Sequence, residues 1–195
     1  MKLFYVPGVC SLSPHIVLRE MGADFELDKV DRATKISASG VNYNQLNPKS
    51  YVPALQLDDG TLLTEGASIV MYLADQKGGE KVAPKPGTME RYKMQEWLVF
   101  IASEIHKNFG ALFRKTPDPV PRELLLKRLD LVAATLAKQP YLLGEQFSVA
   151  DAYLFTVLRW AKRSEIPLPP ALQQFQERVK ARPAVAKALE VEGLT

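Results

Sequence analysis

Cysteine and histidine are scarce in this chain of 195 residues. The only cysteine is Cys10, and the only histidines are His15 and His106. A single thiol excludes an intrachain disulfide. Three such side chains are too few for the usual structural zinc site, so we expect no metal. Long apolar runs are missing too: no stretch approaches the roughly 18–20 residues that span a bilayer, so we expect no membrane partner.

We also expect no secretory leader, because Pro7-Gly8 interrupts the first apolar run before a leader core could form. We therefore expect a cytoplasmic location. The free thiol agrees with this expectation, since reducing compartments keep cysteines reduced.

The charge divides the chain into two compositional halves. Residues 1–80 hold 7 basic and 10 acidic side chains, whereas residues 81–195 hold 18 and 12. In the basic half, lysine and arginine alternate with glutamate along amphipathic stretches, and no basic run is interleaved with aromatic residues. This pattern is typical of solvated helix faces and predicts no nucleic-acid partner.

The first half carries the strand signals. Residues 2–5 predict a short strand, and Ser13-Pro14 opens a helix that Gly22 closes. Residues 25–30 predict a second strand, parallel to the first. Residues 52–57 and 61–63 predict a hairpin turning at Asp58-Asp59-Gly60, and a helix follows Glu65. The order βαβ-ββα predicts a mixed four-stranded α/β domain over residues 1–78.

The second half predicts an all-helical bundle over residues 88–195, after a linker at 79–87 rich in glycine and proline. We expect a long helix at 88–114, further helices at 122–138 and 148–164, and shorter ones after Pro170 and Pro183. The core stripe of the first is Leu98, Ile101, Ala102, Ile105, Phe109, Leu112 and Phe113. Ser148-x-x-Asp151 predicts a capping box at the start of the helix at 148–164.

Three short segments carry chemistry, each with a structural alternative. Cys10 lies between a strand and the start of a helix, where backbone N–H groups and the helix dipole favour the thiolate; a small buried apolar side chain is the alternative. Val52-Pro53 indicates a strand entry that could pair with an extended peptide, although an ordinary turn is the simpler interpretation. Glu65-Gly66 at a helix start could hold an amino-acid-like ligand end, or Glu65 could merely complement the dipole.

A series of motifs runs in order through nearly the whole chain. They are residues 1–5 with Pro7-Gly8 and Cys10-Ser11-Leu12; residues 47–49 and 52–55; residues 57–66; residues 72–75; Glu96-Trp97-Leu98; and residues 150–160. Together they resemble the cytosolic glutathione transferases, and within them the bacterial beta class, which has a cysteine in the active site.

The resemblance implies a thioredoxin-like domain followed by a helical domain, and a homodimer with active sites at the domain boundary. It also implies an enzyme that conjugates glutathione, as co-substrate rather than tightly bound cofactor, to a small apolar or aromatic electrophile. Cys10 would lie beside the glutathione sulfur and form a mixed disulfide with it, giving thiol transfer. Val52, before a cis Pro53, would pair with the cysteinyl backbone.

The same resemblance assigns the ends of the ligand. Glu65 and the Gly66 N–H would hold the γ-glutamyl end, and Lys35 would reach the glycyl carboxylate. His106 would assist the thiol, with Ser103 and Glu104 completing the wall, one or both across the dimer interface. The chain departs from the beta class at Val99, where asparagine is usual. A missing neutral hydrogen bond there would weaken glutathione binding by about 0.5–1.5 kcal/mol.

Two other functions stay open at this level: a monothiol, glutaredoxin-like disulfide reductase, and a non-catalytic binder of apolar ligands or a protein. Trp97, Tyr153 and Trp160 are interpreted as core or interface side chains. His15 is interpreted as a structural or surface residue.

Overall fold

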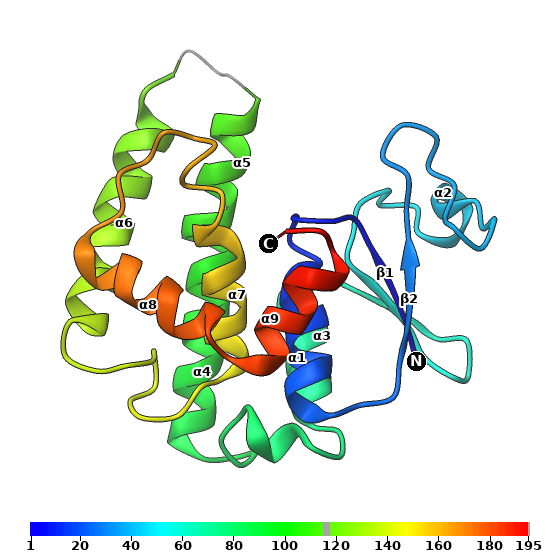
Figure 1. Cartoon of the computed structure of the whole chain (residues 1–195), viewed down its shortest axis with the longest axis horizontal. Coiled ribbons are helices and arrows are strands. Elements are labelled where there is room, and N and C mark those ends of the chain that lie inside the picture. Colours follow the sequence, from blue (N-terminus) through cyan, green and yellow to red (C-terminus); the bar gives the residue numbers. More distant parts are fainter. Residues whose placement is uncertain (115–117, 195) are drawn as a thin grey trace.

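The computed structural model describes residues 1–114 and 118–194. A β-sheet lies on one side of the molecule and a group of helices on the other (Figure 1). The sheet has four strands in the order β2-β1-β3-β4. Strand β1 pairs in parallel with β2 and antiparallel with β3, which pairs antiparallel with β4. The bounds are β1 Lys2–Tyr5, β2 Glu26–Lys29, β3 Ala54–Gln56 and β4 Leu62–Thr64. The predicted mixed sheet and its βαβ-ββα order are confirmed.

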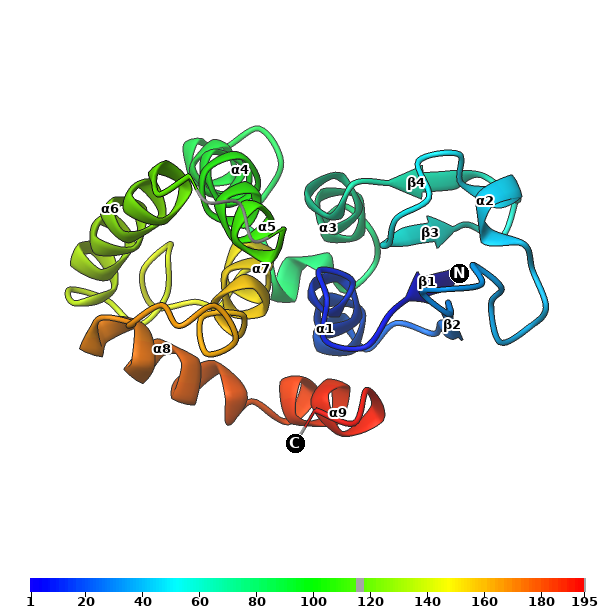
Figure 2. The same ribbon diagram turned by 90° about the horizontal axis from the view of Figure 1, so that it is seen from above.

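Side chains alternate across β1 and create a core on each face of the sheet. Leu3 and Tyr5 belong to the large core, whereas Phe4 and Val6 belong to a smaller one with Tyr43. Helices α1 (Leu12–Met21) and α3 (Gly66–Ala74) lie between the sheet and the helical half (Figure 2), and the short α2 (Tyr43–Leu46) supplies Tyr43 to the other face. Alternation with a period of two therefore places both cores.

The described residues after position 80 form helices and connecting loops. The bounds are α4 Met89–Phe100, α5 Lys107–Phe113, α6 Val120–Leu136, α7 Val149–Leu158, α8 Pro170–Lys180 and α9 Pro183–Val191. A short 3-10 helix, Gly79–Lys81, occupies part of the predicted linker. The all-helical second half is confirmed. No described helix is long and apolar enough to cross a membrane.

The predicted helix at 88–114 is one rod with an irregular centre. Residues Ile101–His106 adopt π-helical turns between α4 and α5. The predicted stripe is only partly core: Leu98, Ile101, Ile105 and Phe109 are fully buried, but Phe113 is 37% exposed. The uniform 100° spacing assumed for the prediction fails here because a π turn holds more residues than an α turn.

Helix α7 forms the centre of the helical half, and all ten of its residues are buried. The predicted capping box is present: Asp151 accepts hydrogen bonds from the Ser148 N–H at 2.8 Å and the Ser148 hydroxyl at 2.7 Å. The helix ends at Leu158, not near Ser164 as expected. Hydrogen-bonded turns follow, and Glu165, at a φ of 53°, completes the change of direction.

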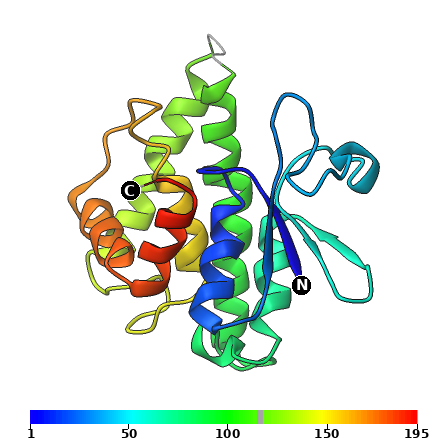
Figure 3. The ribbon, with the colours of Figure 1, turned by 45° about the vertical axis from the view of Figure 1, so that its right-hand side comes forward.

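The two halves share one core, because α1 packs against both α7 and α9 (Figure 3). One link between them is the loop after β1. There the Gly8 N–H donates to Glu192 at 2.9 Å, and the Trp160 indole N–H donates to the Gly8 carbonyl at 3.0 Å. Both backbone polar groups of Gly8 are thus held by the helical half. Gly8 has a φ of 74°, a conformation that favours glycine.

Candidate active site

One cavity of about 340 Å³ collects most of the predicted site residues. It is lined by Cys10, Val52, Pro53, Glu65, Gly66 and His106, together with Tyr51, Ala102, Lys107 and Tyr153. The sheet domain supplies Cys10, Tyr51, Val52, Pro53, Glu65 and Gly66, and the helical half supplies Ala102, His106, Lys107 and Tyr153. The cavity therefore lies at the domain boundary, where the resemblance predicted an active site.

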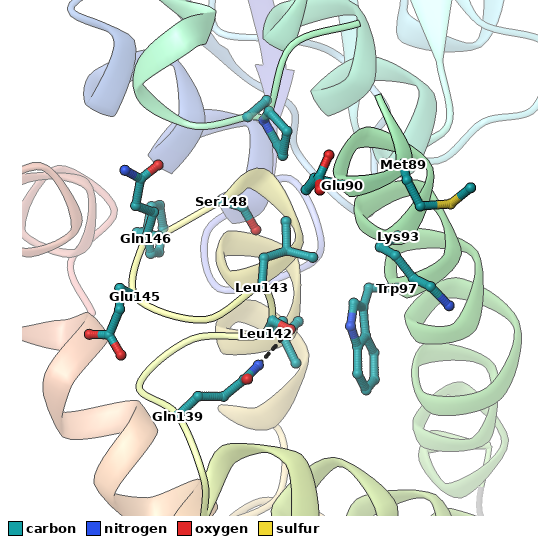
Figure 4. Close-up of a pocket in the computed structure, with 13 residues that line it drawn as sticks. Met89, Glu90, Lys93, Trp97, Gln139, Leu142, Leu143, Glu145, Gln146 and Ser148 are labelled. Atoms are coloured by element: carbon teal, nitrogen blue, oxygen red, sulfur yellow. Dashed lines mark hydrogen bonds between the residues drawn. The ribbon is translucent and has the colours of Figure 1, made fainter. Parts of the chain in front are cut away.

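Two larger cavities, of about 510 Å³ and 750 Å³, lack this chemistry. The one of about 510 Å³ lies in the helical half, where Trp97 of α4 lies across from Leu142 and Leu143 of the loop before α7 (Figure 4). No cysteine or histidine lines it. Within the described ranges, no three histidine, cysteine, aspartate or glutamate side chains gather as metal ligands.

Cys10 lies in the loop between β1 and α1, just before the helix begins. Its thiol donates to the Val52 carbonyl oxygen at an Sγ to O distance of 3.1 Å. Burial raises the pKa of Cys10 to about 11, and the N–H groups of Cys10 and Ser11 offset only part of that effect. The backbone donors at the helix start therefore lower the pKa, as predicted, but desolvation of the charged form outweighs them in the protein without ligand.

The Val52-Pro53 peptide is cis and presents the Val52 carbonyl to the cavity. Pro53 packs beside Gly66: a Cβ on Gly66 would lie 3.7 Å from the proline Cγ. The first turn of α3 therefore lies against the entry of β3, so backbone groups of both segments line the same cavity.

Glu65 caps α3 from an uncommon backbone conformation, with a φ of 69°. Its carboxylate accepts hydrogen bonds from the Lys49 ammonium at 2.6 Å and the Tyr51 hydroxyl at 2.9 Å. Both bonds lower the pKa of Glu65, and the bond from Lys49 has the larger effect. An ionised carboxylate beside the N–H groups at a helix start can hold both charges of an α-amino acid.

His106 ends the π-helical stretch and faces the cavity. Its Nδ1 is hydrogen-bonded to the Tyr153 hydroxyl at 2.7 Å, and its ring packs edge-on to Trp160 with centroids 4.9 Å apart. Burial lowers the pKa of His106, and the negative charge of Glu65 offsets only part of this effect. The imidazole is therefore neutral at pH 7, and among the described residues its Nε2 has no hydrogen-bond partner.

Four residues have a place in the site that the sequence did not reveal. Tyr153 and Trp160 are buried, as predicted, but they also contact His106 and hold its ring in place. Tyr51 and Lys107 line the cavity. No local pattern could reveal the pairing of His106 with Tyr153, since 47 residues separate them. His15 is structural, as interpreted, with Nδ1 bonded to Glu192 at 2.8 Å and Nε2 accepting from Arg19 at 2.8 Å.

Three predicted residues lie outside this cavity. Lys35 lines a neighbouring one of about 120 Å³, which also contains Tyr51 and Val52. The Ser103 hydroxyl bonds to the Val99 carbonyl at 2.9 Å and is exposed, and Glu104 pairs with Arg128 at 2.9 Å. The roles of Lys35, Ser103 and Glu104 stay predictions.

Comparison with known proteins identifies the family. Residues 9–76 match the model for the glutathione S-transferase N-terminal domain, and residues 114–183 match the model for its C-terminal domain. The chain is 48% identical to glutathione S-transferase GstA of Escherichia coli O157:H7 over 200 residues, covering 100% of both. The chain belongs to the glutathione S-transferase family.

Solved structures refine this assignment within the glutathione transferases. A sphingomonad glutathione S-transferase complexed with glutathione is 41% identical, with a TM-score of 0.92 over 100% of both chains. A beta-class enzyme of Sphingomonas chungbukensis is 40% identical, with a TM-score of 0.88 over 100% of both. The chain is thus a transferase similar to the bacterial beta class, with a thioredoxin-like first domain, and neither the reductase nor the binding-only alternative is favoured.

Proposed function

We propose that this glutathione transferase binds glutathione in the 340 Å³ cavity, with the glutathione sulfur beside Cys10. The cysteinyl N–H of the ligand donates to the Val52 carbonyl, the γ-glutamyl end lies on Glu65 and the Gly66 N–H, and the glycyl carboxylate extends toward Lys35. The observation that carries the proposal is the 3.1 Å contact between the Cys10 thiol and the Val52 carbonyl, in one cavity with Glu65 and His106.

In this arrangement His106 acts as the base. A neutral imidazole can accept the proton of the glutathione thiol on Nε2 when Nδ1–H donates to the Tyr153 hydroxyl. Burial raises the pKa of Tyr153, so its hydroxyl stays protonated and orients the ring. The glutathione thiolate then attacks the electrophilic carbon, a C–S bond forms, and the leaving group departs with its bonding electrons.

Cys10 acts as a donor rather than as the attacking thiolate. Because burial keeps its thiol protonated, the S–H can turn from the Val52 carbonyl to a thiolate beside it and stabilise that charge. Thiol transfer is a second, slower activity: the small thiolate fraction of Cys10 attacks a sulfur of glutathione disulfide, forms a mixed disulfide and releases glutathione thiolate.

A homodimer completes the proposal. Helix α4 exposes Met89, Tyr92 and Val99, which are 66%, 56% and 61% exposed. Large apolar side chains that share one helix and remain open to solvent are typical of an interface between subunits. Ser103 follows Val99 by one turn, so in the dimer Ser103 and Glu104 would face the partner. We also propose a cytoplasmic location.

Steady-state conjugation of glutathione to a chlorodinitrobenzene tests the site assignment. We expect His106→Gln to lower kcat by about 10²-fold or more, since a positioned base contributes that much. Glu65→Gln should raise the KM for glutathione and leave kcat nearly unchanged. Glu26→Gln, an exposed carboxylate on β2 outside the cavity, is the matched control. A His106→Gln enzyme with unchanged kcat would remove the base from the proposal.

Intact mass after exposure to glutathione disulfide tests the placement of the sulfur. We expect one reducible glutathione adduct on the native protein and none on Cys10→Ala, whose thiol transfer should be abolished while conjugation is only weakened. If Cys10→Ala kept full thiol transfer, the sulfur of glutathione would not lie beside Cys10.

A further inference from the structure

A second cavity, of about 400 Å³, adjoins the proposed glutathione site. It shares Cys10 and His106 with that site. Its remaining lining comes from the Gly8 loop, Arg32 after β2, Phe113 at the end of α5, the turns after α7, and Leu194 after α9. An electrophile placed there would meet the glutathione sulfur at the shared pair of residues.

One wall of this cavity is aromatic. The Trp160 ring packs against His106 with centroids 4.9 Å apart and against Phe113 with centroids 5.6 Å apart. The guanidinium of Arg163 lies over the Phe113 ring, 5.2 Å from its centroid. A ligand on this wall would therefore contact the Trp160 ring near His106 and the positive charge of Arg163 near Phe113.

The polar lining of the cavity is cationic. Arg32, Arg159 and Arg163 line it, and no aspartate or glutamate does. None of the three arginines forms an ion pair with a carboxylate in the described part of the chain. Among the described residues, Arg159 donates only to the Leu194 carbonyl, at 3.3 Å.

Glu192, whose negative charge acts on Arg159, does not neutralise this positive charge. The Glu192 carboxylate is already bonded to the Gly8 N–H and to His15. Burial lowers the pKa of Arg159 more than Glu192 raises it, so the positive charge is incompletely compensated. Such a group is stabilised when an anion enters the cavity.

We propose that the electrophile of this transferase is an aromatic or apolar molecule that carries a carboxylate, which Arg159 and Arg163 bind while Trp160 and Phe113 contact its apolar part. The proposal rests on the glutathione chemistry proposed above and adds the substrate class. Arg32 also lines the cavity that holds Lys35, so it could serve the glycyl carboxylate of glutathione instead. The assignment therefore depends on Arg159 and Arg163.

Two electrophiles of nearly equal shape test the proposal: 4-chloro-3,5-dinitrobenzoate, an anion, and 4-chloro-3,5-dinitrobenzamide, which is neutral. In both, the glutathione thiolate forms a C–S bond at the chlorinated carbon, and chloride leaves with the bonding electrons. Each kcat/KM is divided by the rate constant of the uncatalysed reaction with glutathione, which removes the difference in intrinsic reactivity. The ratio of the two quotients, carboxylate over amide, is the readout.

We expect this ratio to exceed one in the native enzyme and to fall about three- to tenfold in Arg163→Gln, since a partly exposed guanidinium contributes that much to carboxylate binding. Arg159→Gln should lower the ratio further, and Arg163→Glu should reverse the preference. Lys162→Gln is the matched control, because Lys162 is the exposed neighbour of Arg163 and does not line the cavity. Its ratio should equal that of the native enzyme.

Arg163 is exposed, so its replacement keeps the fold even if Arg159→Gln does not fold. Turnover of both electrophiles with a ratio of one or below, or with equal ratios in the native enzyme and Arg163→Gln, would overturn the substrate class and leave the proposed function intact. Turnover of neither electrophile, in the presence of glutathione, would overturn the proposed function itself.

Discussion

Replacing Glu192 by glutamine tests whether the end of α9 holds the loop that carries Cys10. The two carboxylate oxygens of Glu192 accept from two donors, the partly buried Gly8 N–H at 2.9 Å and the fully buried His15 Nδ1 at 2.8 Å. Arg19 can only donate, so its bond to His15 Nε2 places the imidazole proton on Nδ1. Every group in this network therefore has a fixed donor or acceptor role.

Glutamine has nearly the same shape but cannot satisfy both donors. If its oxygen accepts from His15, its NH₂ group faces the Gly8 N–H, and the reverse orientation opposes it to His15. The other tautomer of His15 gives no relief, because it would place an N–H against Arg19. One donor that is at least partly buried is left unpaired, and a charged acceptor becomes neutral, so we expect Glu192→Gln to lower the free energy of unfolding by about 2–3 kcal/mol.

Urea unfolding followed by tryptophan fluorescence measures this loss, since Trp160 is bonded to Gly8. The matched control is Glu190→Gln on the same helix. Glu190 is exposed and pairs with Lys187 at 2.9 Å, so its replacement should cost at most about 0.5 kcal/mol. If the two glutamine variants were equally stable, the network would not hold the loop.

Three further outcomes follow from other buried positions. Burial raises the pKa of Asp151 to about 6, above its unfolded value near 3.9, so its contribution to the free energy of unfolding should increase as pH falls from 7 through about 6 and be complete below about 4. Urea titrations of the native protein and Asp151→Asn would show this difference, and a parallel pH dependence would contradict it. Gly79→Ala should lower the free energy of unfolding by about 3 kcal/mol or more, because the new Cβ would lie 2.2 Å from the Ala74 carbonyl oxygen. In the control variant Gly60→Ala the new Cβ meets no atom within 4 Å, so the loss should be only about 1 kcal/mol. Equal shifts of the thermal unfolding midpoint in the two variants would refute the contact at Gly79. With a pKa of about 11, Cys10 should be alkylated by iodoacetamide at pH 8 roughly two orders of magnitude more slowly than a free thiol, and a rate equal to that of free cysteine would contradict the desolvation argument.

Local patterns predicted the sheet, most of the helices and the capping box because each depends on residues close in sequence. Gly22 ends α1 at a φ of 70°, and Ser148 with Asp151 starts α7, as their residue types indicated. The π-helical stretch before Lys107 has no such signal, since its composition is that of an ordinary helix. The end of α7 at Leu158 was missed for the same reason.

The resemblance to a family supplied the site residues, but their physical state needed the structure. The pKa of Cys10 depends on how deeply the loop is buried, which the sequence of the loop does not reveal. The partner of His106, Tyr153, is a helical core residue by pattern, and only the packing of α7 against the π-helical stretch brings them together. The arginines after α7 looked like ordinary surface charges until the fold placed them at one cavity.

The contact of α1 with α9 has a consequence for the order of folding during synthesis. Helix α1 buries Leu12, Ile16 and Leu18 completely, and α9 is part of what covers that helix. The ribosome makes α9 more than 160 residues after α1. The nascent sheet domain must therefore expose part of its apolar surface until almost the whole chain has emerged, and contacts so distant in sequence make folding slow. The chain should depend on chaperones more than its modest length suggests.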